Sequence, residues 1–135
     1  MYGVINKSLR DMVTEGHGES VWGQVMVKAG VPNDSFLSMR SYDDEITYRL
    51  AVASSDVLGI DVDSALHAFG KHWVNHTLAR DYDALVRSSG STMLEFLNNL
   101  NELHDRISTT FLDYQPPEFR VSALKNSRMS VEYIS

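Results

Sequence analysis

The chain has 135 residues, is 43% hydrophobic and carries a formal net charge of −6. This length fits one domain with a sizeable core, and the negative charge argues against a nucleic-acid-binding face or attachment to an anionic membrane. The lack of cysteine excludes disulfides, thiolate zinc sites and cysteine nucleophiles. No apolar stretch is long enough to cross a bilayer and the start lacks a secretory signal pattern, so we expect a cytoplasmic protein.

The first three-quarters of the sequence is predicted to be helical, because apolar residues recur at helical spacing between glycine breaks. The first break is Gly16-His17-Gly18, and residues 36–42 form a short irregular stretch. Acidic residues at 43–45, and either Asp61 or Asp63, suit the starts of helices. The predicted helices span residues 2–15, 19–29, 46–58, a segment that ends at about 78, and 81–88.

The last quarter of the sequence changes character. Residues 91–95 resemble a helix N-terminal cap, and the helix that follows carries His104. Pro116-Pro117 ends helical structure, and residues 119–124 and 129–135 are predicted as two strands around a polar turn. The sequence therefore predicts an α+β fold, with an N-terminal helical bundle followed by the start of an antiparallel sheet. Because a lone hairpin is marginally stable, either the strands pack on the helices or the chain is the front part of something longer.

His104 is the most informative single residue, because it shares a helical stripe with apolar side chains. Leu97, Leu100, His104 and Ile107 are three, four and three positions apart, which places them on one helix face. A histidine there is either a core residue satisfied by an ordinary hydrogen bond or the ligand of an enclosed metal or haem iron. The residues alone favour the core histidine.

Other candidate chemistry is weaker. His72 and His76 are four positions apart on a predicted helix and could face one metal, but no HExxH pattern or suitably spaced carboxylate accompanies them. The alternative to a metal-binding pair is that His72 and His76 simply lie on a solvated or partly buried helix face. The glycines do not form a phosphate-binding loop and the serines do not form a nucleophile elbow, so no enzyme is predicted.

Short segments along nearly the whole chain, in matching order and spacing, resemble the haem-nitric oxide/oxygen binding (H-NOX) family, which includes the sensor domain of the soluble guanylate cyclase beta subunit. The segments include Met1-Tyr2-Gly3, Gly18-Glu19, Tyr42-Asp43-Asp44, Ala53-Ser54-Ser55, Phe69-Gly70, Leu103-His104, Pro116-Pro117 and Tyr133-Ile134-Ser135.

The resemblance implies that His104 is the proximal ligand of the iron of haem b, and that its helix is the proximal helix. Leu100 would line the apolar pocket beside the porphyrin, and Pro117 matches a family proline that presses on the porphyrin. Candidates for the distal side and the pocket wall are Tyr2, Ile5, Leu9, Trp73 and Val74.

The family binds the haem propionates through a Tyr-x-Ser-x-Arg motif. Tyr133 and Ser135 match its first two positions and share one face of the predicted strand, and the arginine would stand two residues beyond Ser135. The family's remaining strands and last helix also lie beyond this sequence. We therefore expect residues 1–135 to form a single haem-binding sensor domain that lacks those C-terminal elements.

The function implied by the resemblance is gas sensing rather than catalysis. We expect nitric oxide as the ligand, with oxygen and carbon monoxide as the other diatomic gases to consider. The implied signalling partner is a histidine kinase, a cyclic-dinucleotide enzyme or a cyclase. Two alternatives bind no haem: an all-helical protein-interaction domain in which His104 is a core residue, and a non-functional truncated copy.

Overall fold

The computed structural model describes residues 1–32, 35–124 and 128–134, so the predicted site residue Ser135 lies outside the described part. Helices precede one antiparallel hairpin, which confirms the predicted α+β fold and is inconsistent with an all-helical domain. The chain divides into two compact units: unit 1 is Met1–Thr77 and unit 2 is Leu78–Ser135.

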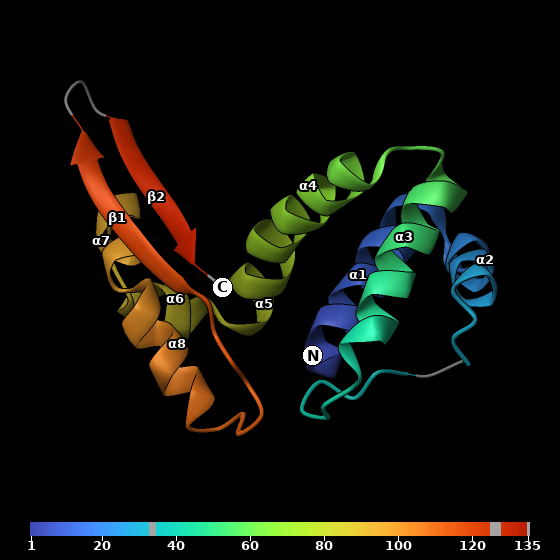
Figure 1. The fold of residues 1–135 in the computed structure, drawn as a ribbon, viewed down its shortest axis with the longest axis horizontal. Helices are drawn as coiled ribbons and strands as arrows, with labels where there is room; N and C mark the ends of the chain where they lie inside the picture. Colours follow the sequence, from blue (N-terminus) through green and yellow to red (C-terminus); the bar gives the residue numbers. More distant parts are fainter. Residues whose placement is uncertain (33–34, 125–127, 135) are drawn as a thin grey trace. The chain divides into compact units, whose positions relative to one another are not determined.

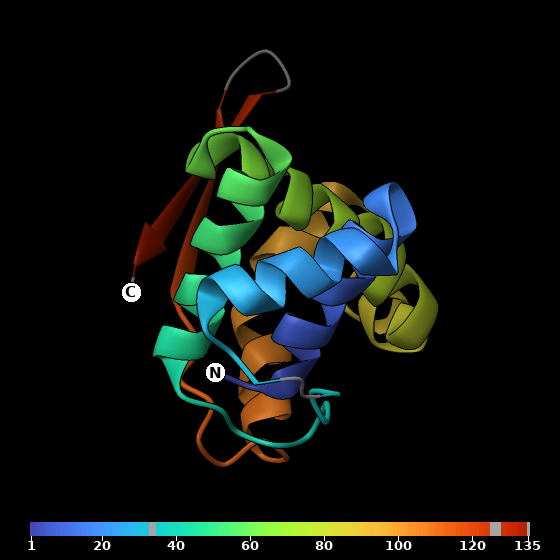
Figure 2. The same cartoon turned by 90° about the vertical axis from the view of Figure 1, so that its right-hand side faces the viewer.

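Unit 1 is a small helical bundle in which α1, α2 and α3 pack against one another, while α4 contacts α1 and α3 (Figure 1). In the view of Figure 2, α2 runs across the front of α1. The elements of unit 1 are α1 (Gly3–His17), α2 (Glu19–Ala29), α3 (Asp44–Leu58), α4 (Val62–His72) and most of a π-helical segment, η1 (Trp73–Leu78).

The core of unit 1 lies between its first three helices and the segment before α3. Val13 on α1, Val25 on α2 and Leu50 on α3 are each at most 1% exposed, and Phe36 closes the cluster from the irregular segment. Burying a side chain of this size contributes about 1.5–3 kcal/mol. The helical spacing of the apolar residues therefore produces one shared core.

Helix ends in unit 1 follow local rules. Gly30 and Gly59 end α2 and α3 in the left-handed conformation, with φ of 61° and 67°. Asp43 and Asp61 begin α3 and α4, because their side chains accept hydrogen bonds from the exposed backbone amides of Glu45 and Ser64. The ends at Gly30 and Gly59 agree with the predictions, α3 begins two residues before its predicted start because Asp44 and Glu45 belong to its first turn, and Asp61 rather than Asp63 caps α4.

The start of α1 is held by the irregular segment at residues 36–42. The backbone amide of Gly3 donates to the Arg40 carbonyl at 2.9 Å, and the amide of Val4 donates to the Ser38 carbonyl at 3.2 Å. A Cβ on Gly3 would overlap the Leu37 carbonyl, so only glycine permits this close approach. Backbone contacts, rather than a capping side chain, therefore place the first turn of α1.

Three helix predictions need correction. The first helix runs through Gly16 to His17, because one glycine within a helix costs only about 1 kcal/mol. The helix predicted to reach about Leu78 changes from α-helix to π-helix after His72. The segment predicted as one helix over 81–88 is divided at Tyr82 into α5 (Ala79–Asp81) and α6 (Asp83–Ser88).

The helix that carries His104 is also divided, into α7 (Met93–Asn98) and α8 (Leu100–Ser108). Asn99 has left the helical conformation, with φ −92° and ψ 2°, and its side-chain amide donates to the Ser89 carbonyl at 2.9 Å. Leu97 is therefore not on the same helix as Leu100 and His104, and the predicted four-residue stripe is wrong at that position.

The hairpin pairs β1 (Glu118–Leu124) with β2 (Arg128–Ile134). Phe119 lies opposite Tyr133, and Val121 lies opposite Val131. Both strands lie within one residue of their predicted limits, and helices α7 and α8 contact β1. Within the described ranges, no helix is long and apolar enough to cross a membrane.

Candidate functional site

His104 lies on α8 in unit 2, beside two aromatic rings. Its ring centroid is 5.7 Å from that of Phe119 on β1 and 6.0 Å from that of Tyr114 in the segment before β1. Phe119 in turn contacts Tyr133 across the hairpin, with the ring centroids 5.5 Å apart. The histidine is therefore half-buried among aromatic side chains.

The surroundings keep His104 neutral. Burial lowers the pKa of its imidazole from the usual 6.5, and the Pro117 carbonyl and the Asp105 charge oppose that shift more weakly. Burial also raises the pKa of Tyr114. Both side chains thus favour their uncharged forms near neutral pH.

One ring nitrogen of His104 is buried without a hydrogen-bond partner. Among the residues that the structure describes, none forms a hydrogen bond of acceptable geometry with Nδ1, although the Pro117 carbonyl acts on the same ring. A buried polar atom without a partner is costly, and a neutral imidazole is a good metal ligand. The residues around His104 therefore fit a group that supplies a metal to the ring.

Asn101 fixes the strand beside His104. Its side-chain nitrogen donates to the Phe119 carbonyl at 2.7 Å, and its side-chain oxygen accepts from the Phe119 amide at 2.8 Å. Asn101 stands three positions before His104, so the two side chains lie on neighbouring parts of one helix surface. This pair of hydrogen bonds holds Phe119 against α8, and sequence reasoning missed it because the partner backbone is remote in the chain.

The other predicted site residues of unit 2 occupy different positions. Leu100 is the first residue of α8 and is half-buried, and Pro117, also half-buried, stands directly before β1. Tyr133 is 62% exposed on β2, and its ring is in T-shaped contact with that of Phe119. The structure therefore brings His104 and Phe119 together with Pro117 and Tyr133 around the start of the hairpin.

The residues predicted for the distal side all lie in unit 1. Tyr2 forms an isolated bridge with Ser41, and Ile5 is half-buried in the first turn of α1. Leu9 is only 5% exposed and belongs to the core cluster, and Trp73 begins η1 with its ring 6.3 Å from that of Phe69. Their assignment to a haem pocket stays a prediction.

A second group of polar side chains in unit 1 includes the two histidines noted in the sequence. His72 and His76 stack at 4.6 Å, and Glu15 from α1 brings a carboxylate to the same place. Sequence spacing could not find Glu15, because it belongs to another helix.

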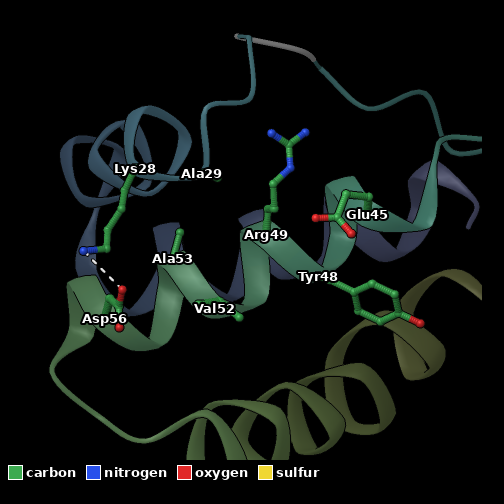
Figure 3. Close-up of a pocket in the computed structure, with 8 residues that line it drawn as sticks. All are labelled: Lys28, Ala29, Glu45, Tyr48, Arg49, Val52, Ala53 and Asp56. Carbon is green, nitrogen blue, oxygen red and sulfur yellow. Dashed lines mark ion pairs between the residues drawn. The ribbon is translucent and has the colours of Figure 1, made fainter.

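A groove of about 270 Å³ in unit 1 is lined mainly by α3, with Lys28 and Ala29 of α2 on one side (Figure 3). An ion pair between Lys28 Nζ and Asp56 Oδ2, at 3.1 Å, crosses one end of it. The predicted site residues do not line this groove. It therefore adds nothing to the site around His104.

A comparison with protein families identifies the family to which the chain belongs. The Haem-NO-binding (HNOB) family matches residues 2–135, so the chain belongs to this family, which is also called H-NOX. The family consists of haem-based gas-sensor domains found in soluble guanylate cyclases. The resemblance noted in the sequence is therefore confirmed over nearly the whole chain.

Solved H-NOX structures have the same fold. The structure of an H-NOX protein from S. oneidensis in the Fe(II)NO ligation state has a TM-score of 0.84 and 23% identity, covering 100% of this chain and 74% of that chain. An unliganded Fe(II) H-NOX mutant from K. algicida has a TM-score of 0.82 and 20% identity, covering 100% and 73%.

The relatives by sequence are longer proteins. Soluble guanylate cyclase gcy-31 of Caenorhabditis elegans is 28% identical over 135 residues, which are 100% of this chain and 19% of that protein. Soluble guanylate cyclase 89Da of Drosophila melanogaster is 24% identical over 100% of this chain and 20% of its own length. The chain thus spans about a fifth of these relatives.

Proposed function

We propose that this chain is a haem-based sensor of nitric oxide, with the iron of haem b held by His104. The observation that carries the proposal is the half-buried imidazole of His104, whose pKa is lowered by burial and whose buried Nδ1 makes no hydrogen bond of acceptable geometry with the described residues. The family takes its name, Haem-NO-binding, from haem and nitric oxide, which supports both the cofactor and the ligand.

Several residues of this chain would hold the group. His104 would bind the iron, Leu100 and Pro117 would contact the macrocycle, and Tyr133 would bind a propionate, with Ser135 beyond the described residues. The distal contacts proposed from the family are Tyr2, Ile5, Leu9 and Trp73. When bound, haem iron would supply an open coordination position for a diatomic gas.

The residues around His104 would transmit a movement of its side chain to strand β1. Any displacement of His104 shifts α8, and Asn101 on that helix is hydrogen-bonded to both backbone groups of Phe119. Strand β1 is therefore linked to the helix of the histidine through two hydrogen bonds. We propose that a guanylate cyclase module reads this shift, because the matched relatives are soluble guanylate cyclases.

The absorption spectrum of protein purified with haem supplied tests the proposal. We expect a strong visible haem band that shifts when nitric oxide is added, and a reduced, altered band in His104→Ala. The control His67→Ala, an exposed histidine on α4, should leave the spectrum unchanged. Adding imidazole to His104→Gly should restore the wild-type band, which separates loss of the ligand from unfolding.

Other results would overturn parts of the proposal. A wild-type protein that takes up no haem, or a band unaffected by His104→Ala, would favour a core histidine or a truncated copy without haem. A shift with oxygen or carbon monoxide but none with nitric oxide would contradict the choice of gas alone.

A further inference from the structure

Three metal-ligating side chains meet in unit 1. Glu15 is in the last turn of α1, His72 ends α4, and His76 lies in η1. One ligand atom from each side chain lies within 4.8 Å of the other two. Glu15 Oε2 is 4.0 Å from His72 Nδ1.

The exposure of the three groups suits an adaptable site. The side chain of His72 is 9% exposed and that of Glu15 is 51% exposed, while His76 is an exposed residue. The buried ring fixes the position, and the two exposed side chains can turn towards it. Ligand atoms around a tetrahedral ion stand about 3.4 Å apart, given bonds of about 2.0–2.2 Å, so small side-chain rotations close the set.

We propose that Glu15, His72 and His76 form a binding site for a divalent transition-metal ion, with Zn²⁺ as the favoured occupant. Two imidazoles and one carboxylate are nitrogen and oxygen ligands that Zn²⁺ accepts, and hard cations such as Mg²⁺ prefer oxygen alone. Three protein ligands leave a fourth position for water. This inference does not depend on the proposed function of His104.

The change of helix type supports the grouping. The π-helical segment begins directly after His72, and such segments occur often at functional sites. Within it, the ring of His76 lies parallel to that of His72, with centroids 4.6 Å apart and planes 9° apart. An ion pair between His72 and Glu15 would need no third group. The ligand atom of His76 lies within 4.8 Å of those of His72 and Glu15, and a turn of its exposed ring would aim it at an ion shared by the three side chains.

An ion in this site would join two helices of unit 1. Glu15 belongs to α1, and both histidines belong to the continuous α4–η1 segment. Because the ion would bind the folded unit and not the unfolded chain as a preformed site, Zn²⁺ should raise the unfolding temperature.

Calorimetric titration of the tag-free full chain with Zn²⁺ alone tests the site. We expect one equivalent of Zn²⁺ to bind. The changes His76→Ala and Glu15→Gln should each weaken binding at least about tenfold, because even the loss of a residue that hydrogen-bonds to a metal ligand lowers metal affinity by about 10–100-fold. The control His67→Ala removes an exposed histidine of α4 and should bind Zn²⁺ like the wild type. A rise in unfolding temperature with Zn²⁺ should vanish in His76→Ala.

Zn²⁺ binding by the His104→Ala variant distinguishes this metal site from the proposed haem site. We expect that variant to keep the Zn²⁺ affinity, so failure of haem binding and failure of the metal site are distinguishable. Wild-type protein without saturable Zn²⁺ binding would overturn the inference. So would undiminished binding in both His76→Ala and Glu15→Gln, or loss of binding in His104→Ala alone.

Discussion

The environment of His104 depends on a small number of neighbouring residues. Burial lowers the pKa of its imidazole, and the rings of Tyr114 and Phe119 stand on two sides of it. Phe119 keeps its place because Asn101 binds both of its backbone groups. One amide side chain therefore sets the surroundings of the residue on which the proposed function rests.

Replacing Asn101 with alanine should loosen this contact. The change Asn101→Ala removes two hydrogen bonds at about 0.5–1.5 kcal/mol each, so we expect the free energy of unfolding to fall by about 1–3 kcal/mol. Urea unfolding followed by far-UV circular dichroism measures the loss. The exposed Asn98 on α7 provides a matched control, and Asn98→Ala should change stability by at most about 0.5 kcal/mol. Equal losses in the two variants would contradict a specific role for Asn101.

At the scale of the element, α7 begins with a complete capping box. The Thr92 hydroxyl accepts from the Glu95 amide at 3.2 Å, and the Glu95 carboxylate accepts from the Thr92 amide at 3.3 Å. The same carboxylate accepts from the hydroxyl and the amide of Ser91. These bonds lower the pKa of Glu95 from 4.5, with the Ser91 hydroxyl as the largest cause. The capping pattern seen in the sequence is thus confirmed.

The lowered pKa gives this cap a defined pH dependence. Near pH 4.5 the unfolded chain binds the Glu95 proton more readily than the folded one, so the stabilisation is present above 4.5 and lost as the pH falls through the folded-state pKa. Glu95→Gln keeps a capping side chain without the charge. We expect it to be less stable than the wild type at pH about 7 and equally stable at pH about 2, by thermal unfolding. A stability difference that does not vary with pH would contradict this explanation.

At the scale of the whole molecule, the two compact units differ in what holds them together. Unit 1 has a core in which Val25 and Leu50 are fully buried. In unit 2, Leu103 on α8 is 7% exposed. The hairpin is held by the pairing of its two strands and by the contacts of β1 with α7 and α8. Both tryptophans, Trp22 and Trp73, belong to unit 1. Tryptophan fluorescence therefore reports on unit 1.

Truncating Leu50 should destabilise unit 1 through loss of buried surface and a residual cavity. We expect Leu50→Ala to lower the free energy of unfolding by about 2–5 kcal/mol, measured by urea unfolding with tryptophan fluorescence. Val52 on the same helix is 49% exposed, so Val52→Ala should cost at most about 0.5 kcal/mol. A similar loss in both variants would show that Leu50 does not anchor this core.

Much of the local structure could be predicted from the sequence, because local chemistry decides it. Gly30 and Gly59 end helices through a left-handed conformation that other residues adopt at a cost, and Asp43 begins a helix through its own side chain. The two strands followed from Pro116-Pro117 and the alternation after it. His104 was found as the one polar residue in an apolar stripe.

The tertiary structure decided the features that join distant segments. The break at Asn99 depends on a hydrogen bond to Ser89, and the position of Phe119 depends on Asn101. Glu15 reaches His72 only because α1 packs beside α4. Periodicity and capping act over a few residues, and so the sequence by itself determined most helix caps and the limits of the two strands, but not the breaks at Tyr82 and Asn99. Which side chains share a site was decided by packing, since contacts between helices depend on the complete fold.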